Sequence, residues 1–238
     1  MCGRYSAARP DEDLAREFDA QTVIDEPPDP SWNVAPTQTA RVVLERAPRA
    51  DPDGAVQRML RNARWGLIPS WAKDLKIGNR LINARAETVT EKPAFKAASA
   101  RRRCLIPADG YYEWEKRDGN KVPYFLHRQE ALLAFAGLYE LWPNPELAED
   151  DPDRWLWSYT ILTRPAPDAL GHVHDRSPVV IPPGELRDRW LDPALTDDAQ
   201  VRELLAEVPE PTLEPRQVST AVNSPKNNGP ELVDAVTD

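Results

Sequence analysis

The stretch YYEWEKRDGNKVPYFLH, residues 111–127, contains two runs rich in aromatic and branched residues on either side of Asp-Gly-Asn. Such runs favour strands, and a short turn sequence of this composition between them is typical of a β-hairpin. In an extended run, Tyr111 and Glu113 face one side of the strand. Tyr112 and Trp114 then face the other side. The stretch therefore predicts two antiparallel strands with a carboxylate beside aromatic side chains.

Segments with the same strand-like composition occur on both sides of this hairpin. Clusters of Pro, Gly, Asp and Asn separate them, as expected for strands joined by turns. The central part of the chain is therefore predicted to be mostly β-structure. The segments are ARVVLE (40–45), RWGLIPSW (64–71), RCLIP (103–107), LLAFAGLYEL (132–141) and SYTILT (158–163).

Segments near both ends of the chain predict helices. In the first, Leu14 and Phe18 are four residues apart and acidic residues occupy the first turn. In the last, Thr196 is the expected N-cap, followed by two aspartates. The predicted helical segments are residues 9–20, 184–191 and 196–208.

Strands interleaved with a few helices, without regular βα alternation, predict an α+β fold. No break in composition divides the chain. We therefore expect one domain over residues 1–238.

The composition indicates a folded protein, because hydrophobic residues make up 41% of the 238 residues and include eight tryptophans. The longest apolar stretch, residues 131–139, is far shorter than a membrane span, and the N-terminus lacks the apolar core of a secretory signal. The two cysteines and three histidines show no metal-binding spacing. We therefore expect a monomeric cytoplasmic protein with no membrane partner, metal or other cofactor.

The charge of the chain is distributed unevenly. The net charge is −9, which by itself argues against a nucleic-acid partner. Residues 41–103, however, contain 15 lysines and arginines against 6 acidic residues. This local excess is either an ordinary solvated surface or a phosphate-binding face.

Cys2 follows a methionine that cells routinely remove. Loss of Met1 would leave one residue with an α-amine and a thiol on adjacent carbons. The α-amine has a pKa of about 7.7 to 8.0, so a substantial fraction is neutral near pH 7.4 and can attack an aldehyde. The thiol can then close a five-membered thiazolidine ring. The same aminothiol also fits an N-terminal nucleophile hydrolase, in which the amine is the base for the thiol.

Two further residues are candidates for proton transfer. Glu113 lies beside aromatic surface, which would raise its pKa and suit it to shuttle protons during imine formation. His174, in GHVHDRSP, titrates near neutral pH. An exposed strand glutamate and a structural histidine are the alternative interpretations.

Polar and aromatic residues elsewhere suit a nucleic acid. Asn83 and Arg85 alternate with Ala84 and share a face if the segment is extended, which suits a carbonyl or hydroxyl group and a phosphate. Two more arginines are phosphate candidates, and each is alternatively an ordinary surface residue. Two tryptophans of RWGLIPSW either stack on bases or pack in the core. These residues are Arg4 and Arg176, and Trp65 and Trp71.

Taken together, nine blocks in order resemble the SOS response-associated peptidase (SRAP) family. The match runs from residue 2 to about residue 232, nearly the whole chain. The blocks are MCGRY, WNVAPTQ, RWGLIPSWAKD, INARAET, RRCLIPADGYYEW, PYF, FAGLYE, HDRSPVVI and AVNSPKNNGPEL.

The resemblance implies a single α+β domain with a twisted, barrel-like, mostly antiparallel β core flanked by helices, and a cleft for single-stranded DNA that contains abasic sites. Cys2 would be the nucleophile that captures the ring-opened sugar aldehyde as a thiazolidine crosslink. Asn83 would contact the sugar, Glu113 would assist proton transfer, and His174 would open the sugar ring and assist reversal. By the same resemblance, other residues would hold phosphates or line the site, namely Arg4, Arg85, Arg176, Thr163 and Trp114.

The implied activity is the formation of a DNA–protein crosslink, with lyase-like or peptidase-like chemistry and removal of Met1 by the protein itself or by methionine aminopeptidase. Binding to DNA would place the cytoplasmic protein at the nucleoid. An N-terminal-cysteine amidohydrolase or peptidase is the alternative function. A non-covalent reader of modified bases is a third hypothesis, although binding alone does not require an aminothiol.

Overall fold

In the computed structural model, the strands of the described residues form two sheets. The structure describes residues 2–47, 54–129, 131–166 and 175–236. The strands are β1 (Tyr5–Ala7), β2 (Thr22–Val23), β3 (Ser31–Val34), β4 (Thr39–Arg46), β5 (Gln57–Trp65), β6 (Asn83–Arg85), β7 (Arg103–Ala108), β8 (Gly110–Arg117), β9 (Asn120–His127), β10 (Leu133–Pro143), β11 (Trp155–Pro165), β12 (Arg176–Pro178) and β13 (Glu214–Gln217). One sheet has the order β13-β9-β8-β1-β3, and the other has the order β12-β11-β10-β7-β4-β5-β2 with β6 on β11.

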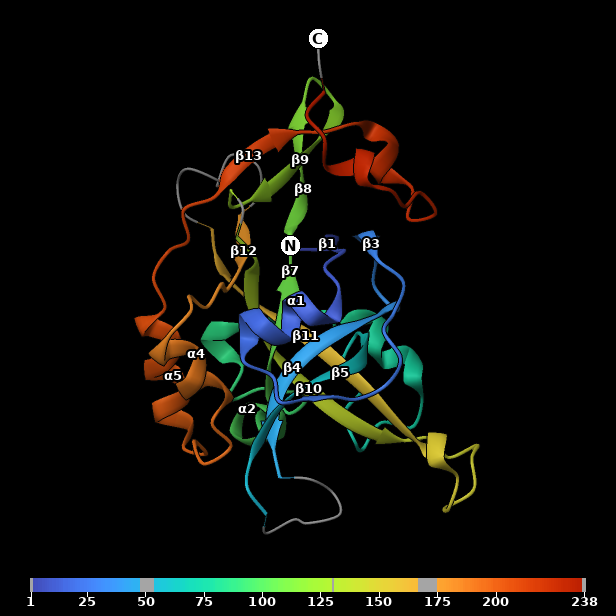
Figure 1. Ribbon diagram of the computed structural model, residues 1–238, viewed down its shortest axis with the longest axis vertical. Helices are drawn as coiled ribbons and strands as arrows, with labels where there is room; N and C mark the ends of the chain where they lie inside the picture. The colour runs from blue at the N-terminus through green and yellow to red at the C-terminus, as the bar shows by residue number, and fades with distance from the viewer. Residues whose placement is uncertain (1, 48–53, 130, 167–174, 237–238) are drawn as a thin grey trace.

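The larger sheet closes on itself as a five-stranded barrel. β11 pairs with β5 in parallel, with Ser158 opposite Arg64 and Tyr159 opposite Trp65. This pairing completes the ring β5-β4-β7-β10-β11, whose other neighbours are antiparallel. The prediction of an α+β fold with a barrel-like, mostly antiparallel core is confirmed. In Figure 1 the barrel lies towards one end of the molecule and β13, β9 and β8 lie towards the other, while β1 and β3, which belong to the same sheet as β8, lie between them.

Residues 111–127 form the predicted hairpin. β8 and β9 are antiparallel, and Arg117 pairs with Asn120 across the turn. Asp118 has φ 50° and Gly119 has φ 80°, the positive angles that a tight two-residue hairpin turn requires at both central positions. The Asp-Gly sequence forms this turn because both residue types tolerate the left-handed region.

The two faces of β8 pack against different cores, as its alternation predicts. Tyr111 belongs to the central core, which fills the barrel and reaches the five-stranded sheet. Tyr112 belongs to a smaller core on the opposite face, with Phe125, and Trp114 packs against it. Glu113, on the Tyr111 side, is therefore directed towards the central core, where it is 4% exposed.

Helices cover the outside of the barrel, and α4, α5 and α2 follow one side of it in Figure 1. Their apolar faces join Leu14, Phe18 and Trp190 to barrel residues in a second large core. The helices are α1 (Asp11–Phe18), α2 (Lys96–Arg101), α4 (Glu185–Leu191) and α5 (Asp198–Glu207). Short 3-10 turns are η1 (Leu75–Arg80), η2 (Ala86–Thr88), η3 (Pro152–Arg154), η4 (Thr220–Asn223) and η5 (Pro230–Val233). In the described part of the chain, no helix combines the length and apolar character needed to cross a bilayer.

Two predictions about local structure need correction, and one helix was not predicted. The N-cap of α5 is Asp197, which accepts hydrogen bonds from the amides of Ala199 and Gln200, and not Thr196. The strand predicted over residues 64–71 ends at Trp65, because Gly66 has φ 117° and turns the chain away from β5. Helix α2 was not predicted, since it has only six residues and no side-chain cap.

Candidate functional site

Cys2 lies three residues before the start of β1 and is completely buried in the central core. Its carbonyl oxygen accepts a hydrogen bond of 2.7 Å from Nδ2 of Asn83. Asn83 begins β6, which lies parallel to β11 with Asn83 opposite Ile161. The barrel therefore places a side-chain amide on the backbone of Cys2, although 81 residues separate the two in sequence.

Cys2 and Glu113 interact electrostatically. Burial raises the pKa of the Cys2 thiol, and the negative charge of Glu113 raises it further. Burial also raises the pKa of the Glu113 carboxyl to about 7, and Asp175 contributes to this increase. Near neutral pH, Glu113 can therefore either donate or accept a proton beside the thiol.

Three tyrosines of the central core interact electrostatically with Cys2, and only Tyr111 among them was predicted to lie on the same side of its strand as Glu113. The hydroxyl groups of Tyr5 and Tyr159 are 2.5 Å apart. Burial raises the pKa of Tyr111, and the charges of Cys2 and Glu113 add to this effect. Alternation within SYTILT would have placed Tyr159 in the barrel interior, but nothing in the sequence indicated its contact with Tyr5.

Asn83 and Arg85 have the alternation that the sequence predicted. Ala84, between them, is 2% exposed, while Arg85 is exposed to solvent. Oδ1 of Asn83 is buried and has no hydrogen-bond partner among the residues that the structure describes. This oxygen is available to accept a hydrogen bond from a hydroxyl group.

Arg4 and Trp114 lie together at the five-stranded sheet. The Arg4 guanidinium carbon lies 5.9 Å from the centroid of the Trp114 ring. Nη1 of Arg4 donates to Oδ1 of Asn33 at 2.8 Å and to the carbonyl of Val222 at 3.0 Å. Nε1 of Trp114 donates to Asn223 at 2.6 Å. The C-terminal segment thus holds both predicted DNA-binding side chains in place.

Arg176 is bound by protein groups in this structure. Its guanidinium donates to both carboxylate oxygens of Glu87 at 2.8 Å. It also donates to the carbonyl oxygen of Thr163 at 2.6 Å and to the hydroxyl of Thr163 at 3.2 Å. Thr163 is only 1% exposed. For Arg176 to bind a phosphate, the phosphate would have to compete with Glu87.

The two tryptophans of RWGLIPSW occupy different environments. Trp65 is completely buried, stacks on Tyr159 with ring centroids 6.3 Å apart, and donates to the carbonyl of Ile82 at 2.9 Å. No base can stack on Trp65 in this structure, because both faces of its ring lie inside the barrel. Trp71 is 61% exposed. Of the two alternatives, the core position is therefore the one found for Trp65, and only Trp71 is free to stack.

Comparisons with known proteins identify the family of the chain. The family model described as SOS response associated peptidase (SRAP) matches residues 1–225. The chain belongs to the SRAP family.

Several relatives cover nearly the whole SRAP chain. "Abasic site processing protein YoqW" of Bacillus subtilis (strain 168) is 41% identical over 238 residues, covering 99% of this chain and 100% of the relative. "Abasic site processing protein HMCES" of Xenopus tropicalis is 31% identical over 229 residues, covering 87% of this chain and 66% of the relative.

Solved structures share the fold. A crystal structure of a protein from Bacteroides thetaiotaomicron has a TM-score of 0.78 at 22% identity, covering 99% of this chain and 100% of that one, which shows the fold alone. A phage-related protein from Bordetella bronchiseptica has a TM-score of 0.64 at 32% identity, covering 91% and 94% of the two chains.

The basic excess of residues 41–103 in this SRAP chain is partly neutralised inside the fold. Arg41 is 4% exposed and forms an ion pair with Asp11. Arg58 forms ion pairs with Glu45 and Asp188. Arg103 is 3% exposed. The local charge therefore overstates the positive surface, because counting charges in sequence does not distinguish buried arginines from exposed ones.

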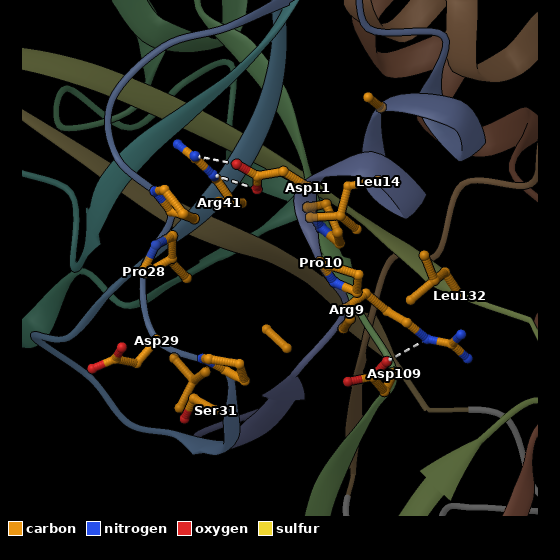
Figure 2. Close-up of a pocket in the computed structure, with 18 of the residues that line it drawn as sticks. Arg9, Pro10, Asp11, Leu14, Pro28, Asp29, Ser31, Arg41, Asp109 and Leu132 are labelled. Carbon is orange, nitrogen blue, oxygen red and sulfur yellow. Dashed lines mark hydrogen bonds and ion pairs between the residues drawn. The ribbon is translucent and has the colours of Figure 1, made fainter.

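A cavity of the SRAP chain lies at a position that Cys2 does not line. It has a volume of about 710 Å³ and lies between α1 and the proline-rich segment that precedes β3. Figure 2 shows the two ion pairs at its wall, Arg41 with Asp11 and Arg9 with Asp109. None of the predicted site residues lines this cavity. The chemistry of the side chains, and not cavity size, therefore identifies the candidate site.

The predicted role of His174 and the predicted absence of a metal ion remain to be compared with the structure. The predicted ring-opening residue, His174, lies outside the described residues. Within the described part of the chain, no group of three or more His, Cys, Asp or Glu side chains is arranged to hold a metal ion.

The buried Glu113 gives a testable prediction about the stability of the SRAP chain. Its pKa in the fold is about 7, against an ordinary value of 4.5. The stability that its protonated form contributes is therefore present below about pH 4.5 and is lost as the pH rises through about 7. We expect Glu113→Gln to remove this loss, which amounts to about 3 kcal/mol between these limits. Urea unfolding of both proteins at about pH 5 and pH 8 checks this; the same pH dependence in both would contradict it.

Proposed function

We propose that this chain processes abasic sites in single-stranded DNA by forming a covalent bond through Cys2 after Met1 has been removed. Two interactions of Cys2 carry the proposal. The side-chain amide of Asn83 donates a hydrogen bond to the Cys2 carbonyl oxygen, and the negative charge of Glu113 raises the pKa of the Cys2 thiol. The relatives named as abasic site processing proteins support the substrate class.

The chemistry consists of two additions and one dehydration. The neutral α-amine of Cys2 adds to the aldehyde carbon of the ring-opened sugar and gives a carbinolamine. Protonated Glu113 donates a proton to the departing hydroxyl group, so that water leaves and a protonated imine forms. The thiol then adds to the imine carbon, its proton passes to the Glu113 carboxylate, and a thiazolidine ring closes. The net reaction joins protein and DNA with the loss of one water molecule.

The surrounding residues have distinct proposed roles. The unsatisfied Oδ1 of Asn83 would accept a hydrogen bond from a sugar hydroxyl group. Arg4, Arg85 and Arg176 would bind phosphates on either side of the lesion. Trp114 would line the site beside Arg4. His174 would act in ring opening and reversal.

The complete burial of the Cys2 side chain sets a condition on the reaction. A thiol with no exposed surface reacts with DNA only after the segment before β1 has opened. Removal of Met1 shortens this segment and creates the amine that the reaction needs. Intact mass spectrometry of the purified protein reports whether Met1 has been removed, and a protein that retains Met1 should not react.

A crosslinking assay tests the proposal directly. An oligonucleotide that contains uracil is treated with uracil-DNA glycosylase, incubated with the mature protein and run on a denaturing gel. We expect a heat-resistant shifted band whose mass equals protein plus DNA minus one water. Cys2→Ala should abolish the band, whereas Cys104→Ala should retain it, because Cys104 is an equally buried thiol with no amine beside it.

Two outcomes of this assay would contradict the proposal. If no band formed with fully processed protein, covalent capture would be wrong. If the protein hydrolysed an amide substrate without DNA, and Cys2→Ala stopped this, the N-terminal hydrolase hypothesis would be favoured.

A further inference from the structure

A second cavity opens at the end of the barrel where β4 ends and β5 and β11 begin. It has a volume of about 480 Å³. In each of these strands every second residue faces the barrel interior. At this end of the barrel the inward-facing residues include Arg46, Arg61 and Trp157. We call this cavity the barrel mouth. Openings of β-barrels are common positions for ligand sites.

Two arginines and two tryptophans dominate the barrel mouth. The guanidinium carbon of Arg61 lies 3.9 Å from the centroid of the Trp157 ring, and that of Arg46 lies 5.6 Å away. Trp157 itself stacks on Tyr139, with centroids 5.3 Å apart and planes at 18°. Trp155, two residues earlier on β11, lines the same cavity and is 41% exposed. A fixed, stacked ring thus supports both cations, and an exposed indole lies beside them.

The charges of the barrel mouth are not balanced by its own lining. Its described lining residues include two arginines and no aspartate or glutamate, although the whole chain has a net charge of −9. Asp25, which is outside the lining, forms a long ion pair with Arg61, with 3.6 Å between Oδ2 and Nε, so one of the two arginines keeps a partial counter-charge. Nε of Arg61 is buried and has no hydrogen-bond partner among the described residues. Two neighbouring cations with an unused donor favour the binding of an anion.

The barrel mouth is separate from the Cys2 site. Asn83, which contacts Cys2, pairs with Ile161 on β11. Ile161 lies about 20 Å farther along β11 than Trp155, at the usual rise per strand residue. An anion in the barrel mouth therefore cannot contact Cys2, and a lesion bound at Cys2 does not occupy the barrel mouth.

We propose that the barrel mouth binds a nucleotide, with its phosphate on Arg46 and Arg61 and its base stacked on Trp155. Arginine guanidinium groups bind phosphate oxygens through paired hydrogen bonds. A tryptophan face stacks on any of the bases. Gln57 and Thr22, which are hydrogen-bonded to each other at 3.1 Å, supply polar groups for the edge of the base. The nucleotide is either free or part of a DNA strand, since both present the same phosphate and base.

Isothermal titration calorimetry on the Cys2→Ala protein tests this inference, because no crosslink forms at the other site. The probes are dAMP, inorganic phosphate and a short 5′-phosphorylated single-stranded oligonucleotide without an abasic site. We expect dAMP or the oligonucleotide to bind, more tightly than inorganic phosphate does. Arg46→Gln and Trp155→Ala should each weaken this binding about tenfold. Arg16→Gln is the matched control, because Arg16 lies on α1 with 76% of its side chain exposed and should have no effect.

The probes distinguish the source of the nucleotide. Binding of dAMP would assign the site to a free nucleotide, and binding of only the oligonucleotide would assign it to DNA; either supports the proposal if both variants weaken it. Urea unfolding of each variant shows whether the fold is retained. The inference is wrong if no probe binds, if phosphate alone binds as tightly as dAMP, or if Arg46→Gln and Trp155→Ala leave binding unchanged.

Discussion

Replacement of Glu113 by glutamine should slow the formation of the covalent product by about 10² to 10⁴-fold at neutral pH, the usual contribution of a positioned general acid or base. Glutamine keeps the size and hydrogen-bonding capacity of the side chain but cannot donate or accept the proton. Glu113 is buried beside Cys2, so solvent water does not easily replace it. The rate is measured under single-turnover conditions with protein in excess over the abasic oligonucleotide.

The pH dependence of this rate identifies the role of Glu113. Its acid form, which in the proposed reaction expels water from the carbinolamine, is lost as the pH rises through about 7. The neutral α-amine, the proposed nucleophile, is gained as the pH rises through about 8. The wild-type rate should therefore pass through a maximum between these values. Glu113→Gln should lose the falling arm and rise to a plateau.

Glu115→Gln is the matched control for this prediction. Glu115 lies on the same strand and forms an ion pair with Arg117 near the end of the hairpin. Its replacement should leave both the rate and the pH maximum unchanged. A Glu113→Gln protein that reacted at the wild-type rate, with the same maximum, would exclude proton transfer by this carboxyl group.

The two tryptophans of RWGLIPSW should differ widely in their effect on stability. Trp65→Ala should lower the free energy of unfolding by about 3 to 5 kcal/mol, as expected when a large buried ring is removed from a core. The substitution removes the contacts with Tyr5 and Tyr159 and leaves the carbonyl of Ile82 without its donor. Trp71→Ala should change stability by no more than about 0.5 kcal/mol, because Trp71 is largely exposed.

Urea unfolding monitored by circular dichroism measures both effects. If Trp65→Ala is too unstable to purify, Trp65→Phe retains most of the ring and should still lose about 1 to 3 kcal/mol through the unsatisfied carbonyl group. The affinity for single-stranded DNA should show the opposite pattern to stability. Trp71→Ala should weaken this binding, whereas Trp65→Phe should not. Equal stability losses in the two alanine variants would contradict the positions of these side chains.

The sequence predicted the elements that depend on short segments of chain. The hairpin of residues 111–127 follows from local alternation and an Asp-Gly turn, and the helix around Leu14 and Phe18 follows from their spacing. The orientation of Glu113 towards a core follows from the period of two residues in a strand. These properties depend on only a few neighbouring residues, so a single sequence contains them.

The order of the nine sequence blocks was enough to predict the family, while the chemistry predicted from the position of Cys2 stays a prediction. The aminothiol depends only on the second residue of the chain. The match to the SRAP family over residues 1–225 confirms that resemblance. The positions of Trp65 and Arg41 were not predictable in this way, because an arginine or tryptophan in a strand has the same local sequence whether it is buried or exposed.

Only the tertiary structure brought together groups that are far apart in the chain. The parallel pairing of β5 with β11 closes the barrel and places Tyr159 against Trp65. Arg4 donates to the carbonyl of Val222, 218 residues away, and the barrel mouth assembles Arg46, Arg61 and Trp157 from three strands. Local backbone preferences and side-chain periodicity belong to short windows of sequence. Which distant strands pair, and hence which side chains meet, depends on how the whole chain buries its apolar surface at once.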